Sequence, residues 1–232
     1  AGLGNVGTAL IECIENNFNY YQEKLSLEIK IIGISAKSKN KKRSIDINNY
    51  KWFDDPREMA KLKNCDVIVE LIGEEKGISH ELIHLSLLNN KHVVTGNKSL
   101  IANHGKDLFK LAEKNNLALL FEAAVAGAIP IINTIKNDIA MNKIKKISGI
   151  LNGTTNYILT KMQEDNLPFD EVLKIAKDKG FTSDNEAKLD IGGYDAAHKL
   201  TILSALSFGA NLNFNQNYIE GISNVKIEDI NF

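Results

Sequence analysis

The sequence predicts an α/β fold in which a Rossmann-type, doubly wound parallel sheet is followed by an α+β region. The chain opens with a glycine-rich turn, Gly2-Leu-Gly-Asn-Val-Gly7, that leads into a stretch of helical periodicity. Short β-branched runs then alternate with amphipathic stretches up to about residue 124. Such alternation indicates parallel strands with helices on both faces of the sheet. Mainly helical patterns follow, so we predict two domains, residues 1–124 and 125–232.

The elements predicted for the first domain alternate in type along the chain. Apolar residues from Val6 to Ile14 recur at helical spacing, and the β-branched run from Ile29 to Ile34 indicates a buried strand. Further strands are expected over residues 66–73, 92–95 and 117–121, and further helices over residues 78–88 and 100–115. A glycine-rich turn of this kind normally follows a strand. We therefore expect the sequence to be incomplete at its amino end.

The elements predicted for the second domain are mostly helices. Helical patterns cover residues 129–141, 155–164, 169–179 and 196–208. Residues 143–151 alternate roughly between apolar and polar, which predicts a strand. The last residues, Ile230 to Phe232, form no closing element, so we expect the carboxyl end to be incomplete as well.

Composition excludes several classes of function. Of the 232 residues, 44% are hydrophobic and 25% are charged, and the net charge is −1. No global field therefore attracts nucleic acid or a membrane surface, and no apolar run approaches the ~18 residues of a membrane span. The two cysteines, Cys13 and Cys65, are predicted to be core residues rather than a disulfide, which fits a cytoplasmic location.

The glycine-rich turn has the spacing of a dinucleotide-binding site. The first glycine permits a tight turn, the second leaves room for a pyrophosphate, and the third lets the helix pack closely on a strand. An NAD site usually has an acid at the end of the second strand of the fold. Here that strand is the one that contains Ile29 to Ile34. It ends Ile34-Ser-Ala36-Lys37, without an acid, and is followed by Lys39, Lys41, Lys42 and Arg43. These cations favour the 2′-phosphate of NADP. The alternative is a solvated basic loop without a ligand.

A charged pair begins the last long helix. Asp195 and Lys199 are spaced i, i+4, so they share one face, and Ile202 and Leu206 continue that face as an apolar stripe. The pair is therefore predicted to be partly buried. A lysine ammonium there could give a proton to a carbonyl oxygen as a hydride reaches the carbon. The alternative is an ordinary surface ion pair.

Five segments together resemble the homoserine dehydrogenases, in order and in spacing. They are Val69–Gly73, Thr95–Lys98, Phe121–Pro130, Gly149–Tyr157 and Gly192–Leu200. The resemblance implies reversible, NADPH-dependent reduction of L-aspartate 4-semialdehyde to L-homoserine, in threonine, methionine and isoleucine biosynthesis. It also implies a cytoplasmic homodimer whose second domain carries catalysis and dimerisation.

The resemblance implies a role for particular residues. Lys199 gives the proton, Asp195 holds the substrate amino group, and Asn152, Gly153 and Thr154 lie beside the substrate. A second substrate acid is expected after Gly180-Phe181, where Asp184 and Glu186 both remain candidates. Contacts with the cofactor are expected from Gly2, Leu3, Gly4, Asn5, Val6, Gly7, Ala36, Lys37, Thr95, Lys98 and Gly180. A Na⁺ or K⁺ site is expected at Glu122, Val125, Gly127 and Ile129.

Two other functions remain open from the sequence. One is an NAD(P)-dependent oxidoreductase that acts on a different small substrate. The other is a binding module that holds NADP and catalyses nothing.

Overall fold

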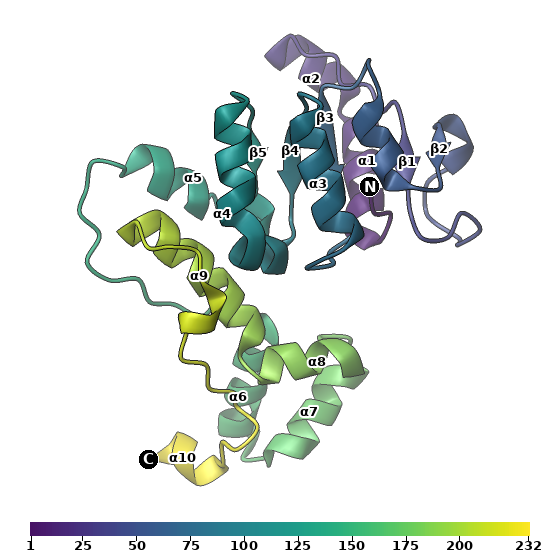
Figure 1. The fold of residues 1–232 in the computed structure, drawn as a ribbon. Helices are drawn as coiled ribbons and strands as arrows, with labels where there is room; N and C mark the ends of the chain where they lie inside the picture. Colours follow the sequence, from purple (N-terminus) through teal and green to yellow (C-terminus); the bar gives the residue numbers. More distant parts are fainter. The chain divides into compact units, whose positions relative to one another are not determined.

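The computed structural model describes the main chain of residues 1–232 and every side chain except that of Asn185. The chain divides into two units, residues 1–129 and 130–232 (Figure 1). The boundary expected after residue 124 lies within the last loop of the first unit and stays a prediction. None of the described helices is both long enough and apolar enough to cross a bilayer.

The first unit is built on parallel strands. One sheet holds three strands in sequence order, β3 (Val67–Glu70), β4 (His92–Thr95) and β5 (Leu119–Leu120). A second sheet pairs β1 (Ile34–Ser35) with β2 (Trp52–Phe53). Every pair is parallel, which confirms the predicted α/β class and the strands expected near residues 66–73, 92–95 and 117–121.

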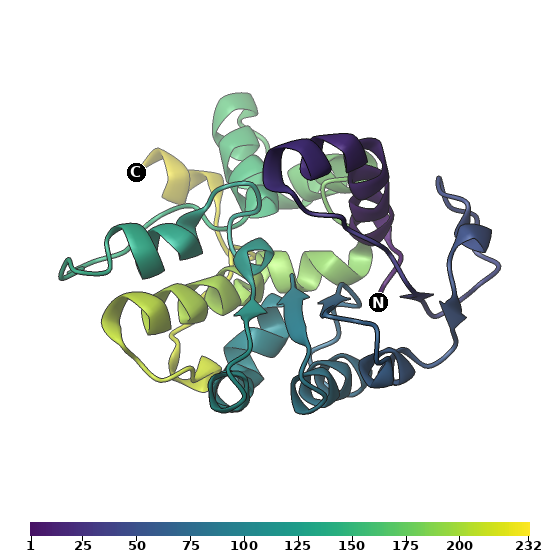
Figure 2. The same cartoon turned by 90° about the horizontal axis from the view of Figure 1, so that it is seen from above.

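Helices cover the strands of the first unit on two sides. They are α1 (Asn5–Asn16), α2 (Phe18–Leu25), α3 (Ile78–Leu88) and α4 (Lys98–Lys114), with short 3₁₀ turns η1 (Ile47–Asn49), η2 (Pro56–Lys61) and η3 (Glu122–Ala124). Helix α1 lies on one side of the strands, and α3 and α4 lie on the other (Figure 2). Apolar side chains of α3 and α4, among them Leu82, Leu87 and Leu100, are wholly buried. Their removal from water is what holds these helices to the sheet.

The first residues of the chain lie between the two sheets. The Ala1 nitrogen donates to Val69 O at 2.7 Å, and Ala1 O accepts from Leu71 N at 2.8 Å. On the other side Gly2 N donates to Ser35 O at 2.8 Å. Ala1 and Gly2 therefore form strand-like hydrogen bonds to both neighbours.

The strand predicted over residues 29–34 is shorter than expected, because only Ile34 and Ser35 belong to β1. Residues 29–32 instead line an apolar cavity of about 770 Å³, together with side chains of α1 and of residues 65–71. A β-branched run becomes a strand only where another strand offers hydrogen bonds to it. No such partner faces residues 29–32 in the described main chain. Cys65 is buried as predicted, whereas Cys13 is exposed on α1, so that prediction was wrong.

The second unit is helical. Its elements are α5 (Ile131–Asn133), the π-helical turn η4 (Thr134–Asp138), α6 (Gly153–Asp165), α7 (Phe169–Asp178), α8 (Asp184–Ile191), α9 (Tyr194–Phe208), the 3₁₀ turn η5 (Phe214–Gln216) and α10 (Ile227–Asn231). Ile158 and Met162 of α6 pack against Val172 and Ala176 of α7, and all four are wholly buried. The helices predicted over residues 155–164, 169–179 and 196–208 are confirmed.

Two predicted elements of the second unit differ from the structure. The strand expected over residues 143–151 is wrong: residues 143–152 have no regular structure, and Ile150 is 77% exposed. An alternating pattern cannot form a strand without a partner, and the main chain of residues 130–232, described throughout, contains no strand. The helix expected over residues 129–141 spans only α5 and the π-helical turn after it.

Candidate active site

The glycine-rich turn has the close contacts that its sequence predicts. Gly2 has φ +93°, and a Cβ there would lie 2.3 Å from Leu71 O. A Cβ on Gly7 would lie 2.0 Å from Gly2 O, whereas nothing lies within 4 Å of the corresponding position on Gly4. Gly2 and Gly7 therefore permit close packing, and Gly4 leaves open space at the start of α1, as a bound phosphate requires.

The amino end of α1 offers donors to an anion. Among the described side chains none caps this end of the helix, so the first N–H groups have no intrahelical partner. A cavity of about 340 Å³ opens beside it, lined by Gly4, Asn5, Thr8 and the basic run Lys41–Arg43. Of the other predicted cofactor residues, Ala36 is partly buried behind the turn, and Lys37 is exposed and does not line the cavity.

A buried polar network lies at the carboxyl ends of β3 and β4. Glu70 is wholly buried, and its Oε1 accepts from the N–H groups of Ile72 and Gly73 at 2.8 and 3.1 Å. Its Oε2 accepts from Thr95 Oγ1 at 2.6 Å. A buried carboxylate is tolerated only when its oxygens are hydrogen-bonded. Glu70 thus fixes the loop after β3 and the hydroxyl of Thr95. The sequence signal for Glu70 is an acid at the end of a buried strand, within the segment Val69–Gly73 that contributes to the resemblance.

The same network sets the start of α4. Asn97 Oδ1 accepts from Leu100 N at 3.1 Å, which caps the helix, while Asn97 Nδ2 donates to Glu74 O at 2.7 Å. Lys98 is the first residue of α4 and is half-buried. Its position at the edge of the sheet where parallel strands end is the usual place for ligands in such folds.

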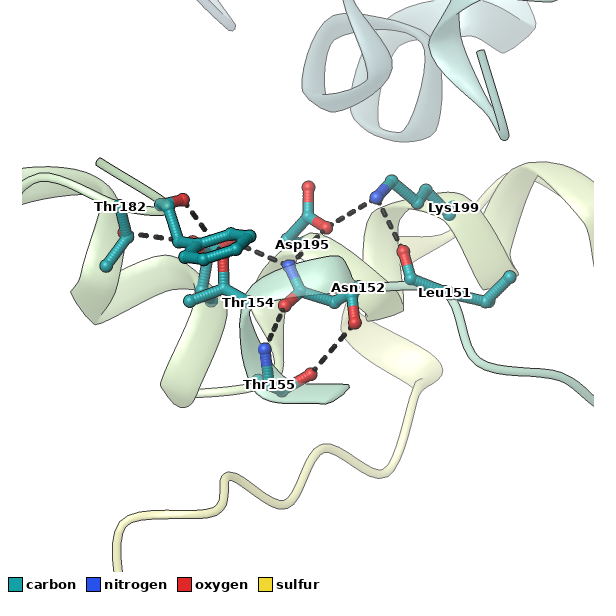
Figure 3. A network of polar contacts seen from close by, with 9 residues as sticks. Leu151, Asn152, Thr154, Thr155, Thr182, Asp195 and Lys199 are labelled. Atoms are coloured by element: carbon teal, nitrogen blue, oxygen red, sulfur yellow. Dashed lines mark hydrogen bonds and ion pairs between the residues drawn. The ribbon is translucent and has the colours of Figure 1, made fainter. Parts of the chain in front are cut away.

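The predicted charged pair in the second unit is formed and largely buried. Lys199 Nζ lies 2.6 Å from Asp195 Oδ2, and the two side chains are only 19% and 10% exposed. The same ammonium donates to Leu151 O at 2.6 Å (Figure 3). A charge-assisted hydrogen bond in such a low-dielectric setting holds its geometry tightly. The alternative of a solvated surface pair is therefore excluded.

Asn152 joins two carboxylates to the start of α6. Its Nδ2 donates to Asp195 Oδ2 at 2.9 Å and to Asp190 Oδ1 at 2.8 Å. Its Oδ1 accepts from Thr155 N at 2.8 Å, which caps α6 (Figure 3). Every polar atom of this amide therefore has a partner, and its rotamer is fixed. Gly153 and Thr154 follow in the first turn of α6, where the Thr154 hydroxyl donates to Phe181 O at 3.2 Å.

Asp190 is a site residue that sequence reasoning missed. It accepts from Asn152, and its Oδ2 also accepts from Thr182 Oγ1 at 3.1 Å. Asp190 lies in the last turn of α8 and Asp195 in the first turn of α9, with Gly192 and Gly193 between them. Gly193 has φ +81°, which reverses the chain and brings the two acids to one amide. The signal available in the sequence was a pair of acids, Asp190 and Asp195, on either side of Gly192-Gly193.

Neither expected candidate for the second substrate acid joins this network. Asp184 forms an ion pair with Lys177 at 2.8 Å and its side chain is 87% exposed. The hydrogen bond from Lys177 holds the pKa of Asp184 below its usual value. Glu186 accepts from Ser183 in the capping box of α8. Gly180, with φ +76°, follows the carboxyl end of α7. Asp184 and Glu186 thus contact Lys177 and Ser183, and Gly180 lies in the turn after α7.

The loop expected to bind a cation has an unusual main chain. Glu122 begins η3, Val125 is buried, and Ile129 is 60% exposed. Ala126 and Ala128 have φ of +51° and +69°, in the left-handed region that costs about 1 kcal/mol for a residue with a Cβ. The described residues contain no cluster of three or more His, Cys, Asp or Glu side chains suited to a metal. Any cation here must therefore depend mainly on main-chain oxygens.

The arrangement in the second unit supports proton transfer to a bound carbonyl compound. An ammonium is fixed by a carboxylate and a main-chain oxygen, and two carboxylates share one amide donor. The ammonium can protonate an oxygen that becomes negative, and the carboxylates can bind a cationic amino group.

Comparison with known proteins covers both units. The family model described as "Homoserine dehydrogenase, NAD binding domain" matches residues 2–122, and the one described as "Homoserine dehydrogenase" matches residues 130–232. The homoserine dehydrogenase of Neisseria gonorrhoeae is 42% identical over 231 residues, which are 100% of this chain and 52% of that protein. The chain thus spans about half the length of the curated relatives it matches.

Solved structures agree with the family models. The crystal structure of a homoserine dehydrogenase from Thiobacillus denitrificans has a TM-score of 0.92 and 37% identity, over 98% of this chain and 52% of that one. A hyperthermophilic archaeal homoserine dehydrogenase in complex with NADPH has a TM-score of 0.66 and 31% identity, over 73% of this chain and 51% of that one. The resemblance of the five sequence segments is confirmed. The chain belongs to the homoserine dehydrogenase family.

Proposed function

We propose that this chain carries the catalytic machinery for the reversible, NADPH-dependent reduction of L-aspartate 4-semialdehyde to L-homoserine. The observation that carries the proposal is the fixed Asp195–Lys199 pair, whose ammonium is hydrogen-bonded to a carboxylate and a carbonyl. Family membership supports the substrate. The reaction serves threonine, methionine and isoleucine synthesis in the cytoplasm, by a homodimer.

In this proposal the residues of the second unit bind the substrate and manage one proton. Bound NADPH supplies the hydride to the carbonyl carbon. Lys199 gives a proton to the carbonyl oxygen, which becomes the hydroxyl of homoserine, and takes another from solvent. Asp195 orients the ammonium and, with Asp190, binds the amino group of the substrate. Asn152 holds these two carboxylates at fixed positions, because its one amide nitrogen donates to both.

The preference for NADP rests on the first unit. The strand predicted to end near Ile34 is followed by Ser35, Ala36 and Lys37, at the position where an NAD enzyme would have an acid. The basic run Lys41–Arg43 lines the cavity beside the glycine turn, and the archaeal relative was solved with NADPH. Residues of the turn, together with Thr95 and Lys98 at the sheet edge, hold the cofactor. Gly180 is proposed to contact it as well.

The cation site is proposed for the loop from Glu122 to Ile129. Left-handed residues at Ala126 and Ala128 change the direction of the main chain twice in three residues. Such turns allow the carbonyls of Val125, Gly127 and Ile129 to converge beside the Glu122 carboxylate, a donor set that suits Na⁺ or K⁺. Activity in K⁺ or Na⁺ salts should then exceed that in a tetramethylammonium salt of equal ionic strength.

Two assays on the purified chain test the proposal, one for each direction of the reaction. NADPH oxidation is followed with L-aspartate 4-semialdehyde, and NADP⁺ reduction is followed with L-homoserine. Turnover in both directions is expected. If other small aldehydes are reduced at an equal or greater rate, the substrate is wrong. If NADPH binds and no substrate consumes it, the protein is a binding module, and the proposed function fails.

A further inference from the structure

The guanidinium of Arg43 holds the basic loop against the glycine turn. Its Nη2 donates to Ser38 O at 2.7 Å, and its Nη1 donates to Lys39 O and Lys41 O at 3.3 and 2.9 Å. Its Nε donates to Leu3 O, within the turn, at 3.2 Å. Four of the five N–H groups of this side chain are thus bonded to main-chain oxygens. Little of the guanidinium remains available to a ligand.

The aromatic ring of Trp52 supports this arrangement from β2. The centre of the Arg43 guanidinium lies 5.9 Å from the ring centroid and the Lys39 ammonium lies 6.0 Å from it. Both distances fall within the range of cation–π attraction. Trp52 is itself fixed, because its Nε1 donates to Asp54 at 2.8 Å. The loop from Ser38 to Arg43 therefore has a defined shape before any ligand arrives.

The cavity formed by this loop is basic and opens beside the amino end of α1. It has a volume of about 340 Å³ and is lined by Gly4, Asn5, Thr8, Lys41, Lys42 and Arg43. Lys41 and Lys42 are exposed, and neither forms an ion pair with any described side chain. Lys37 and Lys39, in the same loop, do not line the cavity.

We propose that Arg43 is a positioning residue for recognition of the 2′-phosphate of NADP, and that Lys41 and Lys42 make the direct contacts. The inference rests on the proposed function, since it requires that the glycine turn bind a dinucleotide. Two ammonium groups beside the turn provide charge-assisted donors to a dianion. Arg43 acts through the loop, because its own donors are already bonded to carbonyls. The sequence prediction attributed the preference for the 2′-phosphate to all five cations between Lys37 and Arg43, and the lining of the cavity favours Lys41 and Lys42 among them.

The experiment is calorimetric titration of the full chain with NADP⁺ and with NAD⁺, which differ only in the 2′-phosphate. Four variants are compared: Lys41→Ala/Lys42→Ala, Arg43→Ala, Arg43→Lys and, as the control, Lys24→Ala. The control removes one positive charge from an exposed lysine in the last turn of α2, which does not line the cavity. Thermal unfolding of each variant is recorded to show that the nucleotide-binding unit remains folded.

The double lysine variant should weaken NADP⁺ binding by about tenfold or more and change NAD⁺ binding by less than about twofold. Arg43→Ala should show the same selective loss. Arg43→Lys should not restore NADP⁺ binding, because one ammonium cannot bond to four carbonyls at separate positions. Lys24→Ala should leave the ratio of the two affinities within about twofold.

Three results would overturn the inference alone: an unchanged affinity ratio in the double variant, an NADP⁺ affinity restored by Arg43→Lys, or an equal loss in Lys24→Ala. The first result would mean that the lysines do not contact the 2′-phosphate, and the second that Arg43 contacts it directly. The third would mean that loss of any positive charge weakens binding. An unaltered chain that binds neither nucleotide would refute the proposed function itself. One that binds NAD⁺ but not NADP⁺ would refute the NADP preference.

Discussion

The hydrogen bonds of Lys199 fix its ammonium and leave it accessible to a ligand. Two acceptors at 2.6 Å, Asp195 Oδ2 and Leu151 O, hold the group, and 19% of the side chain remains exposed. The third N–H of the ammonium can therefore point to a substrate oxygen. In the proposed function this ammonium acts as a proton donor by its position, since α9 and the loop before α6 define where its nitrogen lies.

Replacing Lys199 by alanine should lower kcat by at least about a hundredfold, because the developing alkoxide loses its proton donor. The rate of NADPH oxidation with aspartate semialdehyde measures this effect. Lys161→Ala is the matched control, since Lys161 is paired with Glu164 at 2.9 Å on the outer face of α6. Nearly normal turnover in the Lys199→Ala chain would show that this residue is not the proton donor.

Asp190 and Asp184 differ in environment, and their substitutions should differ in effect. Asp190→Asn should raise the KM for aspartate semialdehyde by about tenfold or more, because the carboxylate that the proposed function assigns to the substrate amino group is lost. Asp184→Asn should change KM by less than about twofold, since that side chain is 87% exposed and paired with Lys177. Steady-state kinetics on both variants measures the two KM values. The reverse ranking would place the substrate acid at Asp184.

At the scale of elements, the site depends on the amino ends of helices. Asn97 caps α4, Asn152 caps α6 and Ser183 caps α8, each by accepting a main-chain N–H with its side-chain oxygen. Asn97 and Asn152 use their amide nitrogens for a second purpose. Asn97 fixes the loop at Glu74, and Asn152 connects the two acids. Helix capping and site geometry thus share the same side chains.

Asn152→Ala should therefore destabilise the second unit more than loss of a cap alone. The cap is worth about 1 kcal/mol, and leaving Asp190 and Asp195 without their shared donor adds about 1–3 kcal/mol. Ser183→Ala, which removes only a capping box, should cost about 1 kcal/mol. Urea unfolding followed by circular dichroism measures both. Equal losses would mean that the amide bridge contributes nothing to stability.

At the scale of the whole molecule, Ala1 and Gly2 connect the two sheets of the first unit. Ala1 O accepts from Leu71 N at 2.8 Å, directly after β3, and Gly2 N donates to Ser35 O of β1 at 2.8 Å. Main-chain hydrogen bonds between segments far apart in the sequence therefore join these sheets.

Local patterns were sufficient to predict much of the fold and part of the site. The strands at Val67–Glu70 and His92–Thr95 were predictable because burial on both faces requires a β-branched run. Asp195 and Lys199 were predictable because a helix places residues i and i+4 on one face. The glycine turn was predictable because Gly2 and Gly7 permit contacts that no other residue allows.

The sequence by itself determined the α/β class, the nucleotide turn and the Asp195–Lys199 pair, since each depends on residues close together in the chain. Only the tertiary structure decided that Asn152, 43 positions away, bonds to Asp195 and also to Asp190. It likewise decided that residues 143–152 form no strand and that Arg43 is bonded to main-chain oxygens. A helix or turn is formed by its own residues, whereas a strand, a shared hydrogen bond or a pocket wall needs a partner that no local pattern specifies.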